Sequence, residues 1–383
     1  MPSVRNPADG SPFRLPRIFD SAAGDRLAPA YWILLLTLVL VPLGMAPGLH
    51  FFDVTPKLLA LVGGASLVWL ALIAANSFPA PPPGRGVYFQ LLAALGLVGV
   101  LATLFSADAV LSLAGSEGRR LGLPAWLASL ALAGAIPAVI GNNPVRRRHL
   151  LAAMALTGVA AAVYGFAQYL GVDPWINSAL YRIGEGAEQV VRPPSTFGHA
   201  NYFAIYLLVA LFGAIGLAFS ASTKRARWGW AAAAATLGMG LMISGSRAGW
   251  VGALAGIAIL SLRPALRDRR ALATGALVTV VLALLFVVSP LGQPLRNRAR
   301  TFQDDPGITG RVLVWRDTLP LIAANPLLGT GPDTYELRFP QAESVELAQL
   351  APDQYAESPH NVFLDSMVAI GLPGGLLFVA LVA

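Results

Sequence analysis

The chain has 383 residues, of which 56% are hydrophobic and only 12% charged, whereas soluble globular domains carry about 25% charged residues, so the composition excludes an ordinary soluble protein. The absence of cysteine excludes disulfides, thiolate catalysis and cysteine-ligated metals. The net charge of +7 does not indicate nucleic-acid binding, because the basic residues are scattered in short segments between apolar runs.

Apolar runs recur along the whole chain, and a helix of about 20 such residues crosses the roughly 30 Å hydrocarbon core of a bilayer. We therefore predict an all-α polytopic membrane protein with about ten transmembrane helices. The predicted spans are residues 31–48, 56–75, 87–106, 121–140, 149–170, 200–220, 228–244, 247–262, 271–289 and 360–383.

The segments between these spans divide the chain into four parts. Residues 1–28 are expected to be a flexible cytoplasmic tail, and residues 29–289 contain the first nine spans. Residues 290–359 form a long extracytoplasmic loop, which we expect to contain a helix at 309–329 because structureless loops of that length are uncommon. The tenth span, 360–383, ends in mid-helix, so we expect the chain to be C-terminally truncated.

The distribution of charge predicts the orientation. If the N-terminus lies in the cytoplasm, the inner segments hold 15 Lys and Arg residues and 4 acidic residues, against 12 and 16 in the rest of the chain. Positive charge concentrates in this way on the cytoplasmic side of membrane proteins. The loops at 107–120, 171–199 and 290–359 then lie on the outer face.

Several polar side chains stand at this predicted outer face. His360 and Asn361 begin the last span, and a histidine there can act as a base. Arg247 lies in a short turn between two spans, where a charge is costly and commonly functional. Further planar, permanently charged donors, which suit a diphosphate, are Arg119, Arg120, Arg192 and Arg311.

Four sequence blocks resemble those of the O-antigen ligase/polymerase superfamily. They are STFGHANYFAIYL at 195–207, SGSRAGWVGALAG at 244–256, NPLLGTGPDTY at 325–335 and SPHNVFLDSMVAIGLPG at 358–374. Two earlier segments, at 112–123 and 164–174, fit looser blocks of the same family. The resemblance runs from about residue 100 to the end, in the family's order and spacing.

This resemblance implies a glycosyltransferase of the bacterial cytoplasmic (inner) membrane that needs no cofactor. The donor would be a glycan on a polyprenyl diphosphate such as undecaprenyl diphosphate. The acceptor would be a hydroxyl of a glycolipid such as lipopolysaccharide core, of a growing glycan or of a protein, at the outer, periplasmic face. Ligase, polymerase and protein glycosyltransferase stay open. The family's loop histidine falls on His360 and its turn arginine on Arg247, with Arg192 a third match; Arg311, Arg119 and Arg120 match more loosely.

The expected reaction is an inverting, metal-independent displacement, with His360 as general base and the arginines on the diphosphate. Some members carry a second histidine where this chain has Ser358. Asn361 could hold the histidine or the helix start, and Asn201 and Tyr202 are sugar or headgroup contacts or core residues. His199 could act as a base or ligand, but a structural hydrogen bond is favoured because asparagine is usual there. The outer carboxylates form no compact motif with the histidines, so no metal site is predicted.

Two other classes of function stay open from the sequence. A transporter, for example of a small anion such as bicarbonate, could use the same helical fold, although transporters usually place ionisable residues near the membrane midplane. A non-catalytic scaffold or receptor could use the loop at 290–359, with its acidic run from Glu336 to Glu357, as a binding domain.

Overall fold

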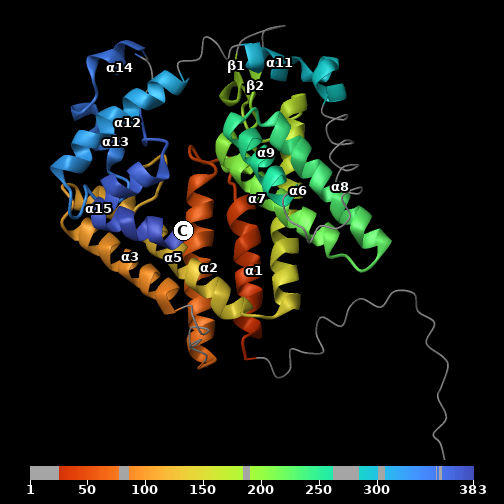
Figure 1. Cartoon of the computed structure of the whole chain (residues 1–383), viewed down its shortest axis with the longest axis horizontal. Coiled ribbons are helices and arrows are strands. Elements are labelled where there is room, and N and C mark those ends of the chain that lie inside the picture. The colour runs from red at the N-terminus through yellow and green to blue at the C-terminus, as the bar shows by residue number, and fades with distance from the viewer. Residues whose placement is uncertain are drawn as a thin grey trace, which may run out of the picture.

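The protein is a bundle of α-helices with additional short helices stacked at one end (Figure 1). The computed structural model describes residues 26–76, 86–183, 190–261, 284–300, 307–350, 352 and 356–383. Most of the predicted N-terminal tail, the basic segment at 263–270 and most of the predicted span at 271–289 lie outside these residues.

The long helices are α1 (Ala28–Leu43), α2 (Val54–Ala74), α3 (Gly86–Leu104), α5 (Leu123–Ile140), α6 (Pro144–Leu170), α7 (Ala200–Phe219), α8 (Lys224–Ile243), α9 (Arg247–Ser261), α12 (Gly307–Ala324) and α15 (Val362–Val382). The shorter helices are α4 (Ala109–Ala114), α11 (Gln293–Arg300), α13 (Tyr335–Arg338) and α14 (Val345–Leu350). Two strands of two residues each, β1 (Arg182–Ile183) and β2 (Val190–Val191), pair antiparallel.

Six of the described helices are long and apolar enough to cross a membrane: α2, α3, α5, α6, α7 and α15. They coincide with six of the predicted spans, so the all-α membrane architecture is confirmed, whereas the count of ten is not. The predicted span at 31–48 appears as a helix of only 16 residues. It ends at Leu43 because Gly44 is extended and Pro47 follows. α9 is also short, and α8 begins with three basic residues.

Small residues let the central helices approach closely. A side chain at Gly158 of α6 would come within 2.8 Å of Ala210 of α7, and one at Gly240 of α8 would come within 2.9 Å of Ala162 of α6. Such contacts hold helices together where lipid removes the hydrophobic driving force. α6, α7 and α8 therefore form one tightly packed group, with α9 against α7 and α8.

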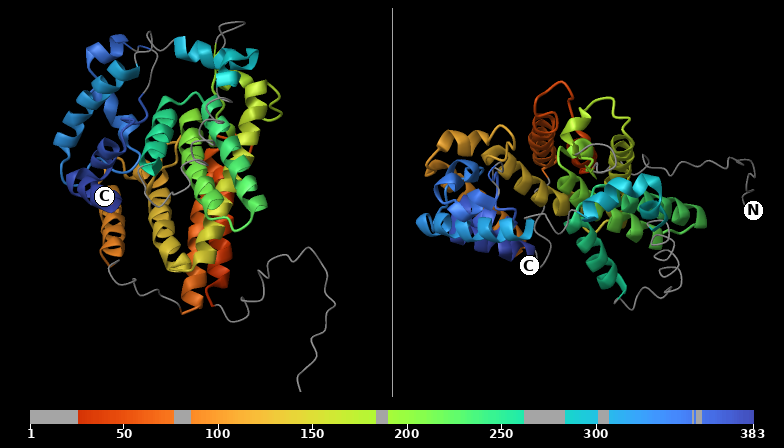
Figure 2. Two further views of the ribbon diagram at one scale, coloured as in Figure 1. Left: turned by 45° about the vertical axis from the view of Figure 1, so that its right-hand side comes forward. Right: turned by 90° about the horizontal axis from the view of Figure 1, so that it is seen from above.

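A second group of helices lies on the other side of the bundle, as Figures 1 and 2 both show. α15 packs against α3, and α12 packs against α15. Leu313, Val314 and Ile322 of α12 share a buried cluster with Val368 of α15. α1, α2 and α5 form a further buried cluster that joins the two sides, because α1 also contacts α6 and α5 also contacts α3.

The last span is not a continuous helix. α15 breaks at Ile370 and Gly371, and Gly371 has the left-handed φ of 71°. The loop at 326–331 fills the break: the backbone N–H groups of Thr330 and Gly331 donate to the carbonyl oxygens of Val368 and Ala369. Because the loop satisfies the freed carbonyls, the break is compatible with a membrane setting.

The segments predicted to lie outside gather at one end of the bundle. α11, α12, α14 and the strand pair lie at this end, whereas the α5–α6 and α7–α8 junctions lie at the opposite end (Figure 1). The latter junctions carry the basic clusters at 146–148 and 224–227. The helical bundle therefore separates the two sets of loops as the charge pattern requires.

Candidate active site

The start of α15 presents His360 at the end of the bundle that carries α12 and α14. Asn361 is the N-cap of this helix, since its side-chain oxygen accepts from the N–H groups of Phe363 and Leu364 at 3.0 and 3.4 Å. Asparagine is among the best residues for this role. Asn361 is predicted to hold either the histidine or the helix start, and in the structure it caps the helix. The capped helix fixes the point at which His360 leaves the bundle.

His360 itself has a left-handed backbone, with φ of 50°. This conformation is uncommon for residues other than glycine, and such residues cluster at active sites and ligand clamps. The residue is exposed, yet the surrounding protein removes part of its water and lowers the pKa of the imidazole; Arg311 and Arg119 lower it further. A lowered pKa keeps the imidazole neutral, and thus able to accept a proton, at physiological pH.

α12 approaches the same histidine from a second direction. Trp315 donates from its indole nitrogen to the carbonyl oxygen of Pro359 at 2.9 Å. Arg311 lies one helical turn before Trp315, on the same face of α12, and acts electrostatically on His360. The structure thus brings the predicted residues Arg311 and His360 together, with Trp315 as the contact between their segments.

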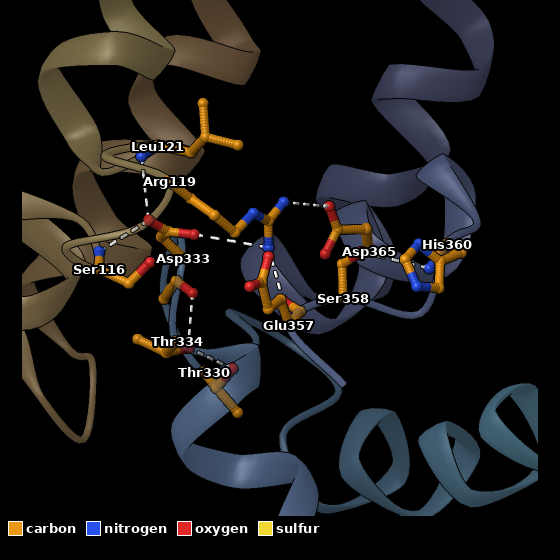
Figure 3. Close-up of polar contacts among 11 residues, drawn as sticks. Ser116, Arg119, Leu121, Thr330, Asp333, Thr334, Glu357, Ser358, His360 and Asp365 are labelled. Atoms are coloured by element: carbon orange, nitrogen blue, oxygen red, sulfur yellow. Dashed lines mark hydrogen bonds and ion pairs between the residues drawn. The ribbon is translucent and has the colours of Figure 1, made fainter. Parts of the chain in front are cut away.

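The guanidinium of Arg119 lies between two carboxylates (Figure 3). It is 3.6 Å from Asp333 and 3.8 Å from Asp365, and it donates to the carbonyl oxygen of Glu357 at 2.6 Å. Figure 3 shows His360 beyond Asp365 on the same side. Arg119 therefore lies in the predicted site, but two acidic side chains already offset its charge.

Asp333 is the buried member of this cluster. Its side chain is 1% exposed and accepts from the backbone N–H groups of Ser116 and Leu121 at 2.8 and 2.9 Å. Burial raises the pKa of Asp333, and Arg119 and the two N–H groups oppose that rise. One carboxylate thus ties the connector after α4 to the loop that fills the break in α15.

A second loop reaches the site from the start of α7. His199 is the N-cap of α7, because its Nδ1 accepts from the N–H of Asn201 at 3.1 Å. Arg192 donates to the side-chain oxygen of Asn201 at 3.1 Å, and the ring of Tyr202 lies 5.4 Å from that of His199. The capping bond supports the favoured structural role of His199. Tyr202 is more than half exposed, which does not fit core packing, one of its two predicted roles.

The segment at 192–202 interacts electrostatically with the loop that carries His360. Burial lowers the pKa of His199, and Arg192 and His360 lower it further, so the two histidines lie within electrostatic range of each other. Tyr202 interacts electrostatically with Arg119, Asp333 and Asp365. The segment at 192–202 and the segment at 356–365 therefore lie within electrostatic range of each other.

Arg247 and Arg120 are the two remaining arginines that the sequence predicts for the site. Arg247 is the first residue of α9. Two residues later, a side chain at Gly249 would come within 3.1 Å of Ala204 in α7, so the start of α9 lies about one turn from the His199 cap. Arg120 follows Arg119 with a left-handed φ of 53°. The start of α9 thus lies close to α7, whereas the charged side chains that act most on the pKa of His360 are Arg311 and Arg119.

Sequence reasoning missed Asp333, Asp365 and Trp315 as members of the site. Asp333 and Asp365 lie inside the blocks at 325–335 and 358–374, so the blocks located the segments but not the contacts. Within the described residues, no group of three or more His, Asp or Glu side chains is placed to hold a metal ion. The side chains present offer a neutral base, exposed guanidinium donors and partly exposed carboxylates around one surface.

Comparison with known proteins agrees with the sequence blocks. Residues 232–379 match the family model described as O-Antigen ligase. The matched segment includes Arg247, Arg311 and the whole of the His360 loop, and it confirms the resemblance seen in the sequence. No curated protein and no solved structure matches the chain.

Proposed function

We propose that this chain, a member of the O-antigen ligase/polymerase superfamily by its residues 232–379, transfers a glycan from a polyprenyl-diphosphate-linked donor to an acceptor hydroxyl. The family match and the membrane helices indicate a multi-pass glycosyl-transferring protein of the bacterial inner membrane. The observation that carries the finer proposal is the position of His360. It is an exposed histidine inside the matched segment, on a loop held by Trp315 and Arg119, and burial, Arg311 and Arg119 lower its pKa.

The reaction is a single displacement with inversion. The acceptor oxygen attacks the anomeric carbon while the neutral imidazole of His360 takes the hydroxyl proton. The bond from the anomeric carbon to the phosphate oxygen breaks, and the diphosphate leaves with its electron pair. Arginine side chains stabilise the negative charge that grows on the diphosphate, a role in which preorganised donors contribute most of the rate enhancement.

Arg311, Arg192 and Arg247 are the proposed diphosphate ligands. Arg311 acts on His360 from α12, and Arg192 reaches the same surface beside Asn201. Arg247 stands at the N-terminus of α9, where the helix dipole adds positive potential for an anion. Three guanidinium groups from separate elements can hold the two phosphates from different sides without a metal ion.

The transporter alternative has less support. In the described membrane helices, charged side chains lie within the first two turns: Lys57 in α2, Arg146–Arg148 in α6 and Asp365 in α15. A transport path would place ionisable groups near the midplane. The charges of these helices thus lie near their ends, where a lipid-linked donor and an aqueous acceptor can meet.

The proposal is tested by mass spectrometry of glycolipids and glycoproteins from cells with and without the gene, complemented by variants. We expect a glycan-modified acceptor to disappear without the protein and to return with the wild type. Arg247→Lys keeps the charge but loses the bidentate fork, so it should restore only a small part of the product. Arg225→Lys, at the opposite end of the bundle, is the matched control and should restore all of it. A normal profile without the protein, together with solute uptake that depends on it, would support the transporter instead.

A further inference from the structure

The loop that carries His360 is held at two backbone positions by side chains from other segments. Arg119 donates to the carbonyl oxygen of Glu357, and Trp315 donates to the carbonyl oxygen of Pro359. These two carbonyls stand three residues and one residue before His360. The backbone N–H of His360 itself makes a local bond, donating to the hydroxyl oxygen of Ser358 at 3.3 Å.

We propose that Arg119 and Trp315 are positioning residues that clamp the backbone of the His360 loop, with Asp333 as the buried anchor of Arg119. This inference rests on the proposed function and assigns Arg119 a role different from donor binding. The guanidinium of Arg119 already contacts Asp333, Asp365 and the carbonyl of Glu357. Two carboxylates therefore already offset the charge of Arg119, and its side chain is 13% exposed, whereas Arg311 on α12 is exposed.

The clamp is needed because the left-handed backbone of His360 is unfavourable without contacts that hold it. A left-handed φ is unfavourable for histidine and persists only where the surrounding contacts impose it. With the backbone held at 357 and 359, the point from which the imidazole extends is fixed. Misplacement of a general base by about 1 Å can reduce a rate by on the order of a hundredfold.

Both arms of the clamp start from parts of the protein that are themselves fixed. Asp333 follows the loop at 326–331, which is hydrogen-bonded into the break of α15. Trp315 projects from α12, whose neighbouring residues Leu313 and Val314 are buried against α15. The break in α15 therefore supports the site. The loop bound in the break precedes Asp333, Asp333 pairs with Arg119, and Arg119 donates to the carbonyl oxygen of Glu357.

The first test does not depend on catalysis. Hydrogen exchange of the peptide spanning 356–361 is measured by mass spectrometry in the full-length protein in lipid nanodiscs. Trp315→Phe removes the indole donor and keeps most of the ring, and Arg119→Gln removes the ion pairs. Each should speed exchange of this peptide by about fivefold, the effect of losing one modest hydrogen bond. Trp228→Phe and Arg225→Gln, which alter exposed residues at the start of α8, are the matched controls and should leave it unchanged.

The second test separates positioning from donor binding. In transfer assays with a lipid-linked donor, Trp315→Phe and Arg119→Lys should lower kcat by roughly tenfold or more, with KM for the donor within about twofold of the wild-type value. A raised KM at unchanged kcat and unchanged exchange would show that Arg119 binds donor, and would overturn the clamp. Unchanged hydrogen exchange in Trp315→Phe and Arg119→Gln would overturn the clamp, whatever activity the protein proved to have. If the variants exchange faster but the wild-type protein shows no transfer, the clamp is kept and the proposed function is rejected.

Discussion

The carboxylate of Asp333 lies 3.6 Å from the guanidinium of Arg119 and is 1% exposed, while the arginine side chain is 13% exposed. This pair joins the connector after α4 to the loop docked on α15, two segments far apart in the sequence. A charge buried to this degree is tolerated only because it is paired and hydrogen-bonded. Its removal should therefore be felt both in stability and at the His360 loop.

Asp333→Ala should lower the free energy of unfolding by about 3 kcal/mol. The change removes one of the two carboxylates near Arg119, and it leaves the backbone N–H groups of Ser116 and Leu121 without their acceptor. Glu346→Ala is the matched control: it also removes a carboxylate from an arginine, but the Arg316–Glu346 pair is exposed at 49% and 64%. That change should have little effect on stability, because water screens an exposed ion pair. Thermal unfolding in detergent measures both, and equal small losses would contradict the anchoring role of Asp333.

The transfer rate should depend on pH through His360. A base must be neutral, so kcat/KM should fall as the pH drops through the pKa of His360, which burial, Arg311 and Arg119 hold below the ordinary 6.5. The charged groups that face it are Arg311 from α12, Arg119 from the connector, His199 before α7, and Glu357 and Asp365 from its own segment.

Arg311→Gln removes one of the two cations, so the pKa of His360 should rise and the fall in kcat/KM should occur at higher pH. Arg316→Gln changes a residue on the same helix whose partners are Asp317 and Glu346, and it should leave the pH profile in place. Profiles of kcat/KM from pH 5 to 8 measure the difference. An acid limb that does not move in Arg311→Gln would argue against His360 as the titrating base.

His199 should prove replaceable by asparagine. Its Nδ1 caps α7 as an acceptor, and asparagine caps helices in the same way, so His199→Asn should keep stability within a few tenths of a kcal/mol. His199→Ala should lose about 1 kcal/mol. Because the folded pKa of His199 is lowered, its contribution is present above the unfolded pKa of about 6.5 and is lost as the pH falls.

Melting temperatures at pH 7.5 and pH 5 test this cap. Between pH 7.5 and pH 5 the wild type should lose more stability than His199→Asn, because the asparagine at position 199 does not titrate. Near-complete loss of transfer by a stable His199→Asn variant would show instead that His199 takes part in the chemistry.

The orientation can be tested directly, because the chain has no cysteine. Ser178→Cys lies in an exposed turn near the strand pair, and Ser222→Cys lies in the exposed turn between α7 and α8. A membrane-impermeant maleimide applied to intact spheroplasts should label the first, and should label the second only after lysis. The reverse pattern would place the His360 end in the cytoplasm and exclude a periplasmic acceptor.

The sequence predicts the helical membrane fold well because long apolar runs leave few alternatives to a spanning helix. It also places His360 at a helix start, since the blocks lie in a recognisable order. It predicts neither the partner of Arg119 nor the indole contact to Pro359, because these bonds join segments that meet only after folding. The break at Gly371 is missed for a different reason: hydropathy is the same for a continuous helix and for one interrupted by glycine.

The central claim, that His360 is the base of a glycan transfer, is tested most directly with purified protein in liposomes. Transfer from a polyprenyl-diphosphate-linked glycan is compared between the wild type and His360→Gln, which keeps a polar side chain of similar size but cannot take a proton. The loss expected for removing a general base is about 10²–10⁴-fold in kcat, with the donor still bound. Turnover by His360→Gln within about twofold of the wild-type value, in a protein of normal stability, would contradict the assignment.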